Sequence, residues 1–261
     1  MTGTLLLRGM LVGLVAGLLC FGFLKIAGEP AVDSAIAFEA RTAEAHEHAP
    51  AGATAAHEHA DDEDGHELVS RPVQAGVGLL TGVVVFASSL GGLFALTFAF
   101  VHGRFGDSGP RVTAAFIAIA GFVSVGLVPF LKYPANPPAV GDPSTLGMRT
   151  SLYFAMIAIS LAAMIGTALL QRHLSSRMSV WNASVVAALG YIVVMIVVAV
   201  GLPGVNEVPE QFPAVVLWQF RLSSIGAQLL MWTTIGLLFG LLTERAAETG
   251  MRRAPLRTST V

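Results

Sequence analysis

Six long apolar segments constrain the fold of this chain more than any other feature of its sequence. Each runs for about twenty residues or more, which is the length that an α-helix needs to cross the hydrocarbon core of a bilayer. Only 12% of the residues are charged, against about 25% in a soluble domain. The sequence therefore predicts an all-α, polytopic integral membrane helix bundle with about six transmembrane helices. The predicted spans are residues 5–27, 73–101, 112–131, 150–170, 182–202 and 214–242.

Positive charge predicts the orientation of these spans, because Lys and Arg are in excess in cytoplasmic loops. With both termini in the cytoplasm, nine Arg residues lie inside and five Lys or Arg residues lie outside. We therefore expect a multi-pass membrane protein with both termini in the cytoplasm. Its expected parts are a first transmembrane helix over 1–27, an extracytoplasmic loop rich in His, Asp and Glu over 28–72, a five-helix membrane bundle over 73–242 and a basic cytoplasmic tail over 243–261.

The first apolar segment carries a glycine at every fourth position. Gly9, Gly13 and Gly17 share one helix face, and small residues at this spacing let a neighbouring helix approach closely. The pattern predicts a tight helix–helix contact. The alternative is a cleaved signal peptide, because Arg8 precedes an apolar core.

Arg221 is the strongly basic residue that lies well within an apolar segment. An arginine at that depth requires a partner, because a bare charge in hydrocarbon is costly. Glu207 and Glu210, on the preceding polar segment, are the nearest acidic residues in the sequence. We expect one of them to form a structural ion pair with Arg221.

The 28–72 loop holds five of the seven histidines and has a formal net charge of −9, from eleven acidic residues minus two arginines. Imidazole nitrogen suits cobalt, nickel, copper and zinc, and carboxylates add oxygen ligands. Two His-Glu-His triplets stand out, and in an extended segment both imidazoles of a triplet lie on one side and can reach one ion. Capture should weaken below about pH 6, where imidazole becomes protonated. The predicted metal ligands are His46, His48, His57, His59 and His66.

Glu29 and Asp33 extend this ligand set toward the membrane. They lie one turn apart in a stretch over 30–48 that we expect to be helical, before a flexible stretch over 49–65. We predict that they pass the ion from the histidines into the bundle. Three alternatives stay open: the two carboxylates act only as helix-end charges, the loop is merely a solvated acidic segment, or it binds metal without being needed for transport.

Several other functions are excluded by missing motifs. No His-Glu-x-x-His zinc motif is present, since Asp61 occupies the position of the second histidine after His57 and Glu58. Lys25 and Lys132 are the only lysines and neither follows a glycine-rich phosphate loop. The single cysteine, Cys20, cannot make a Cys-based zinc site. We therefore expect no enzyme, no resident cofactor and no nucleic-acid partner.

The chain resembles the CbtA family, the larger subunit of a proposed bacterial cobalt transporter. The resemblance implies cobalt uptake across the bacterial cytoplasmic (inner) membrane and a small single-span partner, CbtB, which has its own histidine motif. It implies no catalytic residues. The residues that carry it are Gly28-Glu29-Pro30, Val32-Asp33, Ala35-Ile36, the block from Leu131 to Pro138 (LKYPANPP), Gly141, Arg149-Thr150, Tyr153 and Phe220-Arg221.

Together these features predict a permease subunit for uptake of a divalent metal ion, with cobalt as the first expectation and nickel as the second. The outer histidines would capture the ion, and Glu29, Asp33 and Glu207 would guide it inward. The alternative is a non-transporting membrane sensor or accessory subunit that presents metal to another permease. The second to fifth predicted spans contain no Asp, Glu or His deep within them, and this favours the alternative, because a divalent ion crossing the bilayer centre needs polar ligands.

Overall fold

The computed structural model describes residues 2–47, 70–104 and 108–253, and within these ranges the chain is helical and contains no strand. The histidines at 48, 57, 59 and 66 lie outside the described residues. The elements are α1 (Thr2–Ala27), α2 (Glu29–Glu47), α3 (Arg71–Val73), the π-helical turn η1 (Gln74–Gly78), α4 (Leu79–Val101), α5 (Pro110–Gly121), the π-helical turn η2 (Phe122–Leu127), α6 (Val128–Lys132), the 3₁₀ turn η3 (Pro143–Thr145), α7 (Leu146–Leu174), α8 (Val180–Gly201) and α9 (Ala214–Arg253).

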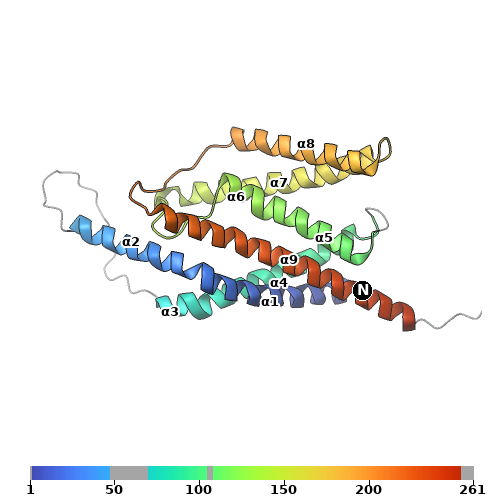
Figure 1. Ribbon diagram of the computed structural model, residues 1–261, viewed down its shortest axis with the longest axis horizontal. Helices are drawn as coiled ribbons and strands as arrows, with labels where there is room; N and C mark the ends of the chain where they lie inside the picture. Colours follow the sequence, from blue (N-terminus) through green and yellow to red (C-terminus); the bar gives the residue numbers. More distant parts are fainter. Residues whose placement is uncertain (1, 48–69, 105–107, 254–261) are drawn as a thin grey trace, which may run out of the picture.

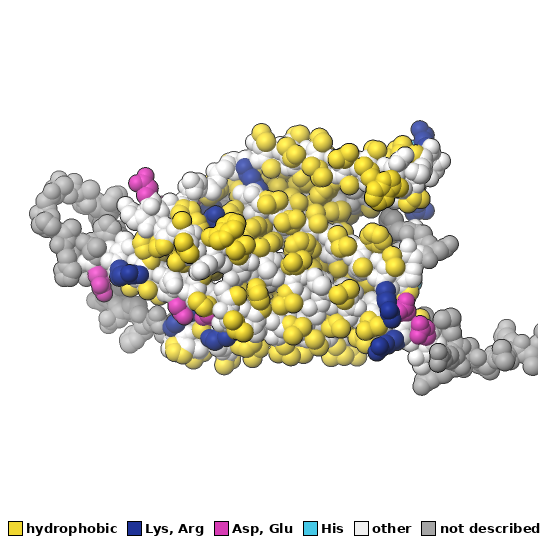
Figure 2. All heavy atoms as spheres, viewed as in Figure 1, with side chains coloured by type: hydrophobic (Ala, Val, Ile, Leu, Met, Phe, Trp, Pro, Cys, Tyr) yellow, Lys and Arg dark blue, Asp and Glu magenta, His cyan; other side chains and the backbone are white. Residues whose placement is uncertain are grey.

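Six of the helical segments are long and apolar enough to cross a membrane, as the sequence predicted. Each of them exposes large apolar side chains on the outside of the bundle. Figure 2 shows apolar side chains over the middle of the molecule, with charged side chains toward its two ends. This surface fits a bilayer and not water. The candidate spans are Thr2–Ala27, Arg71–Val101, Pro110–Lys132, Pro143–Leu174, Val180–Gly201 and Ala214–Thr249.

The spans run antiparallel to one another along the chain, so two ends of the bundle can be distinguished (Figure 1). The α2 end carries α2, α3 and the turn η3. The terminal end is where α1 begins and α9 finishes. α9 packs against α1 on one side and α5 on the other, whereas α8 packs mainly against α7, which contacts the rest of the bundle through η2 and α6.

The contact between α1 and α4 is the most extensive in the bundle. A Cβ added at Gly9 would overlap the backbone carbonyl of Gly91, and one at Gly13 would overlap the carbonyl of Ala87. The two backbones therefore touch, which confirms the close approach that the glycine spacing predicted. Since α1 supplies Val12, Ala16 and Cys20 to the main core, it is packed here as a member of the bundle.

Aromatic side chains fill the core toward the terminal end. Phe94 and Phe98 of α4 both pack edge to face against Phe239 of α9, with ring centroids 5.4 and 5.1 Å apart. Hydrogen bonds and ion pairs then tie the helix ends together. Arg8 donates to the Thr243 hydroxyl over 3.1 Å, and Arg111 pairs with Glu244.

Replacing Gly13 by Leu should break the α1–α4 contact, because the new side chain would have to occupy the space of the α4 backbone. Overpacking of a core costs about 1–3 kcal/mol and occasionally more. We expect a lower unfolding temperature for the purified protein in mild detergent. The matched control is Gly22→Leu on the same helix, where an added Cβ meets no atom within 4 Å. Equal losses in both variants would contradict a specific role for the glycine contact.

Candidate functional site

Glu29 and Asp33 lie at the start of α2, and Arg71 binds both of them. The Arg71 Nη2 lies 2.5 Å from Glu29 Oε2 and 2.8 Å from Asp33 Oδ1, and its Nε donates to the same Asp33 oxygen over 3.1 Å. We call these three residues the Arg71 clamp. Because Arg71 begins α3, the clamp holds together the two described ends of the segment that contains the histidines. No role for Arg71 was predicted from the sequence.

The Arg71 clamp itself carries one excess negative charge. Two carboxylates share one guanidinium, and the Asp33 side chain is 63% exposed while that of Glu29 is 12% exposed. Asp33 is therefore the carboxylate that a solvated ion can reach. Arg71 contacts Glu29 Oε2 and Asp33 Oδ1, so a metal ion that bound through these two oxygens would have to displace the guanidinium.

Helix α2 extends the chain away from the membrane-spanning bundle, as Figure 1 shows. Its inner half is fixed by Ala31 and Ala35, which are buried, and by the edge-to-face contact of Phe38 with Phe212, at 5.1 Å between ring centroids. His46 lies in the last turn of the same helix. At 1.5 Å per residue, it stands about 12 Å along the helix beyond Phe38. The start of the histidine segment is thus carried beyond the packed part of α2.

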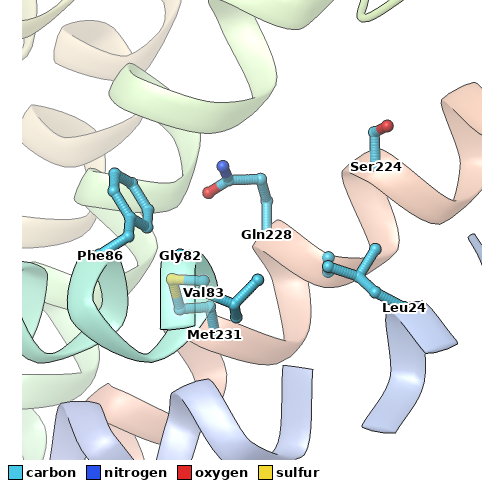
Figure 3. A pocket seen from close by; sticks show the side chains of 8 residues that line it. Leu24, Gly82, Val83, Phe86, Ser224, Gln228 and Met231 are labelled. Carbon is cyan, nitrogen blue, oxygen red and sulfur yellow. The ribbon is translucent and has the colours of Figure 1, made fainter. Parts of the chain in front are cut away.

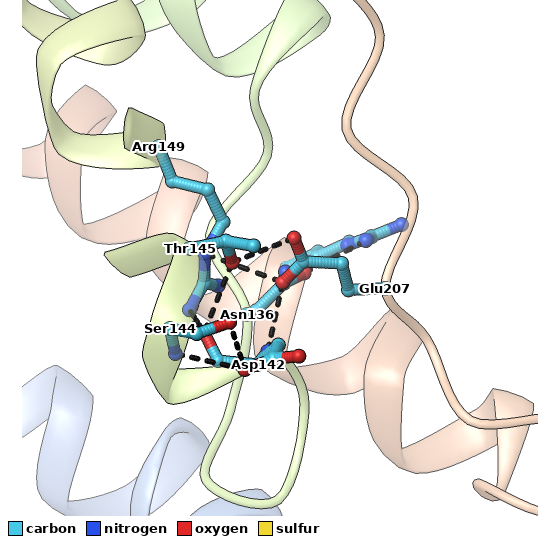
Figure 4. Close-up of polar contacts among 7 residues, drawn as sticks. Asn136, Asp142, Ser144, Thr145, Arg149 and Glu207 are labelled. Atoms are coloured by element: carbon cyan, nitrogen blue, oxygen red, sulfur yellow. Dashed lines mark hydrogen bonds and ion pairs between the residues drawn. The ribbon is translucent and has the colours of Figure 1, made fainter. Parts of the chain in front are cut away.

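A second polar group of residues is centred on Glu207, which lies in the segment after α8 (Figure 4). The other members come from the segment after α6, from η3 and from α7. One Glu207 oxygen accepts from the Asp142 backbone N–H over 2.8 Å, and the other accepts from the Thr145 hydroxyl over 2.7 Å. Arg149 Nε lies 3.3 Å from the carboxylate, and Arg149 Nη2 donates to the Asp142 carbonyl over 3.1 Å. We call Asp142, Thr145, Arg149 and Glu207 the Glu207 cluster.

Gly141 makes this cluster possible. Its φ of +120° lies in a region that L side chains rarely adopt, and a Cβ there would overlap the Arg149 guanidinium. Asp142 then caps the turn η3, since its Oδ1 accepts from the Ser144 N–H and hydroxyl over 2.8 and 2.7 Å. The proline-rich segment between α6 and η3, residues 133–142, is therefore held against the end of the bundle by these contacts.

These hydrogen bonds stabilise the ionised forms of both carboxylates. The Asp142 N–H and the Thr145 hydroxyl hold the pKa of Glu207 below its ordinary value, with a smaller contribution from Arg149. The Ser144 hydroxyl and N–H likewise lower the pKa of Asp142. Glu207 is thus a fully charged but already coordinated carboxylate. Its oxygens are bound by the protein's own donors, which leaves it poorly placed as a ligand for an ion.

The expectation that Arg221 pairs with Glu207 or Glu210 is wrong. Arg221 Nη2 donates to the Asn136 amide oxygen over 2.9 Å, and its Nε lies 3.4 Å from the Ala135 carbonyl. The proline-rich segment folds back over α9 and brings neutral oxygens to Arg221, while Arg149 takes Glu207. Nearness in the sequence misled the prediction, because the partners come from a segment 85 residues away.

The buried polar side chains among the described residues are Ser and Thr hydroxyls, and most of them bind within the protein. The Ser160 and Tyr191 hydroxyls lie 2.8 Å apart between α7 and α8, and the Ser124 hydroxyl donates to the Ala120 carbonyl. Gln228, by contrast, has no hydrogen bond among the described residues. Figure 3 shows its side chain in a pocket of about 350 Å³ between α1, α4 and α9.

No group of three or more His, Cys, Asp and Glu side chains in the described ranges could hold a metal ion. Of the seven ligands predicted from the sequence, the structure places Glu29 and Asp33 together. It places His46 at the end of α2 without describing its side chain, and the other four histidines lie outside the described ranges. Three residues in these polar contacts had no partner predicted from the sequence: Arg71, Arg149 and Asn136.

The six apolar spans, the lipid-compatible surface and the polar groups at the bundle ends define a polytopic α-helical membrane protein. A family model described as "Probable cobalt transporter subunit (CbtA)" matches residues 2–244 of the chain. The chain therefore belongs to the CbtA family of probable cobalt transporter subunits. Comparisons with curated proteins and with solved structures give no match.

The Glu207 cluster should make the protein sensitive to acid. Because the folded-state pKa of Glu207 is lowered, its ionised form contributes stability that is present at neutral pH and lost as the pH falls below its ordinary value of 4.5. We expect the unfolding temperature to fall over this acidic range. Glu207→Gln should be less stable than the wild type at about pH 7 and should lose less of its stability on acidification.

The control for this measurement is Glu210→Gln. Glu210 lies on the same segment and is exposed, so this variant removes the same charge without removing the cluster. It should follow the wild-type profile. If Glu207→Gln also follows that profile at all pH values, the acid sensitivity does not arise from the Glu207 cluster.

Proposed function

We propose that this chain is the permease subunit of a cobalt uptake system and that its histidine-rich segment captures the ion outside the cytoplasm. Membership of the CbtA family across residues 2–244 is the observation that carries the proposal. The six spans supply a membrane-crossing body, and α2 holds His46 beyond its packed part. Nickel is the second candidate ion, because imidazole and carboxylate ligands bind both metals.

In this proposal both termini lie in the cytoplasm and the α2 end faces outward. The histidines bind the ion as neutral imidazoles and deliver it to Asp33 and Glu29, where it displaces Arg71 from the two carboxylates. An inside-negative potential favours entry of a divalent cation by about 4.6 kcal/mol per 100 mV, twice the value for a unit charge. Uptake therefore needs no nucleotide hydrolysis by this chain. A small single-span partner of the CbtB type completes the system.

One observation favours a second function, that of an accessory subunit that binds metal and presents it to another permease. The described interior of the bundle offers neutral oxygen and sulfur atoms but no carboxylate or imidazole between the two polar ends. A divalent ion in hydrocarbon needs such ligands or water. The two functions differ in one measurable respect: only a permease subunit supports uptake in cells that have no other cobalt transporter.

The test of capture is initial uptake of labelled cobalt in such cells, with and without a co-expressed CbtB-type subunit. Changing His46, His48, His57, His59 and His66 to Ala should raise the apparent KM about tenfold, which corresponds to about 1.4 kcal/mol of lost binding free energy. The maximal rate should change little. No uptake under any condition, from a protein that reaches the membrane and binds cobalt, would reject the permease and leave the accessory subunit.

The role of the Arg71 clamp can be isolated in the chain that lacks the five histidines. Arg71→Gln frees Glu29 and Asp33 from a competing positive charge, so cobalt binding to the purified protein should tighten about tenfold. Arg41→Gln is the control: it removes the same charge from α2, where the Arg41 Nε donates to the Ala37 carbonyl. Unchanged or weaker binding in Arg71→Gln would show that the two carboxylates serve the helix junction and not the ion.

A further inference from the structure

Gln228 lies on the membrane-spanning part of α9 in a groove that is open to the outside of the bundle. The groove has a volume of about 350 Å³ and is lined by α1, α4 and α9. Phe86, on its α4 side, is 54% exposed, so the groove can be reached from the lipid. We call it the Gln228 groove. Its lining residues are Leu24, Gly82, Val83, Phe86, Ser224, Ala227, Gln228 and Met231.

The Gln228 carboxamide has two donors and two acceptor positions and no hydrogen bond in the described part of the chain. Its side chain rests near Gly126 of η2, with its Oε1 3.8 Å from where a Cβ on Gly126 would lie. Ser224, one turn away, uses its hydroxyl to donate to the Phe220 carbonyl. A polar group in contact with hydrocarbon is costly unless it is paired. Gln228 therefore has an unmet hydrogen-bonding requirement on the lipid side.

The α4 side of the groove, at Gly82, resembles a helix–helix contact from which the second helix is missing. At the α1–α4 contact, an added Cβ on Gly9 or Gly13 would overlap the facing backbone. At Gly82, an added Cβ would meet no atom within 4 Å, although this residue lies on the same α4. Small residues and hydrogen-bonding side chains are what transmembrane helices use to associate, because lipid provides no hydrophobic drive.

From this geometry we infer that the Gln228 groove is the docking site of a transmembrane helix from a partner subunit. That helix packs against Gly82 and presents a hydrogen-bonding side chain, such as Ser, Thr, Asn, Gln or His, to the Gln228 carboxamide. The family is described as a probable transporter subunit, and the word subunit implies at least one partner protein in the same membrane. The inference rests on the proposed two-component system and assigns the surface where its components meet.

The chemistry of the groove does not suit the transported ion. Its lining contains no carboxylate, imidazole or thiolate, and most of it is aliphatic or aromatic. Arg221 lies two turns from Gln228 on α9, so its positive charge opposes a cation at this end of the groove. An apolar groove that is lined by Gly82 and the neutral Gln228 amide suits the side of a helix far better than a divalent cation.

The test is photo-crosslinking in membranes that contain the full chain and a co-expressed CbtB-type subunit. A photoreactive amino acid at Gly82 should give an adduct between the two proteins. The matched control is the same amino acid at Gly166 of α7, an exposed glycine where an added Cβ also meets no atom within 4 Å. It should give no adduct with the partner. Gln228→Leu should lower the yield at Gly82 about threefold to thirtyfold.

Three results would overturn the inference: an adduct at Gly166 but not at Gly82, an adduct of two copies of this chain through Gly82, or no protein adduct at either position, which would mean that lipid fills the groove. The assay requires no transport. Absence of cobalt uptake together with an adduct at Gly82 would therefore reject the proposed permease and keep the docking site. Uptake that depends on the small subunit, without an adduct at Gly82, would support the proposed permease and reject the docking site.

Discussion

The backbone contact between α1 and α4 determines the geometry of the α2 end. α1 is followed by α2, and α3 leads through η1 into α4. Packing the two long helices side by side therefore fixes where the histidine-containing segment leaves the bundle and where it returns. Arg71 then meets Glu29 and Asp33 across 42 and 38 residues of sequence. The glycines that permit this approach thus help to position two carboxylates that lie beyond the end of α1, at the start of α2.

The bundle also separates its charges by position. Several charged side chains at the ends form ion pairs, as in the Arg71 clamp, the Glu207 cluster and the Arg111–Glu244 pair, whereas the spans bury Ser and Thr hydroxyls. This is the distribution that a low-dielectric environment favours, because each unpaired charge there costs several kcal/mol. Arg221 follows the same rule at the boundary, since Asn136 and Ala135 supply it with oxygen atoms.

The local features of the sequence predicted much of this architecture. Long apolar runs indicated the six spans, the spacing of Gly9, Gly13 and Gly17 indicated the close helix contact, and the alanine-rich stretch over 30–48 indicated a helix close to the observed Glu29–Glu47. Pairings between distant segments were not predictable in this way. Arg71 reaches α2 and Arg221 reaches Asn136 because of how the helices pack, and no local pattern encodes such partners.

Membrane packing also explains why one glycine of α4 is informative and another is not. Gly91 is covered by α1, so its lack of a side chain is explained within the chain. Gly82 lies on the same helix, faces open space and adjoins the Gln228 amide, which has no hydrogen bond to any residue that the structure describes. In water such a surface would be only slightly unfavourable, since solvent would hydrogen-bond to the amide. In hydrocarbon no solvent molecule can do this. A second helix with a small-residue face and a polar side chain would fill the space beside Gly82 and also hydrogen-bond to the Gln228 amide.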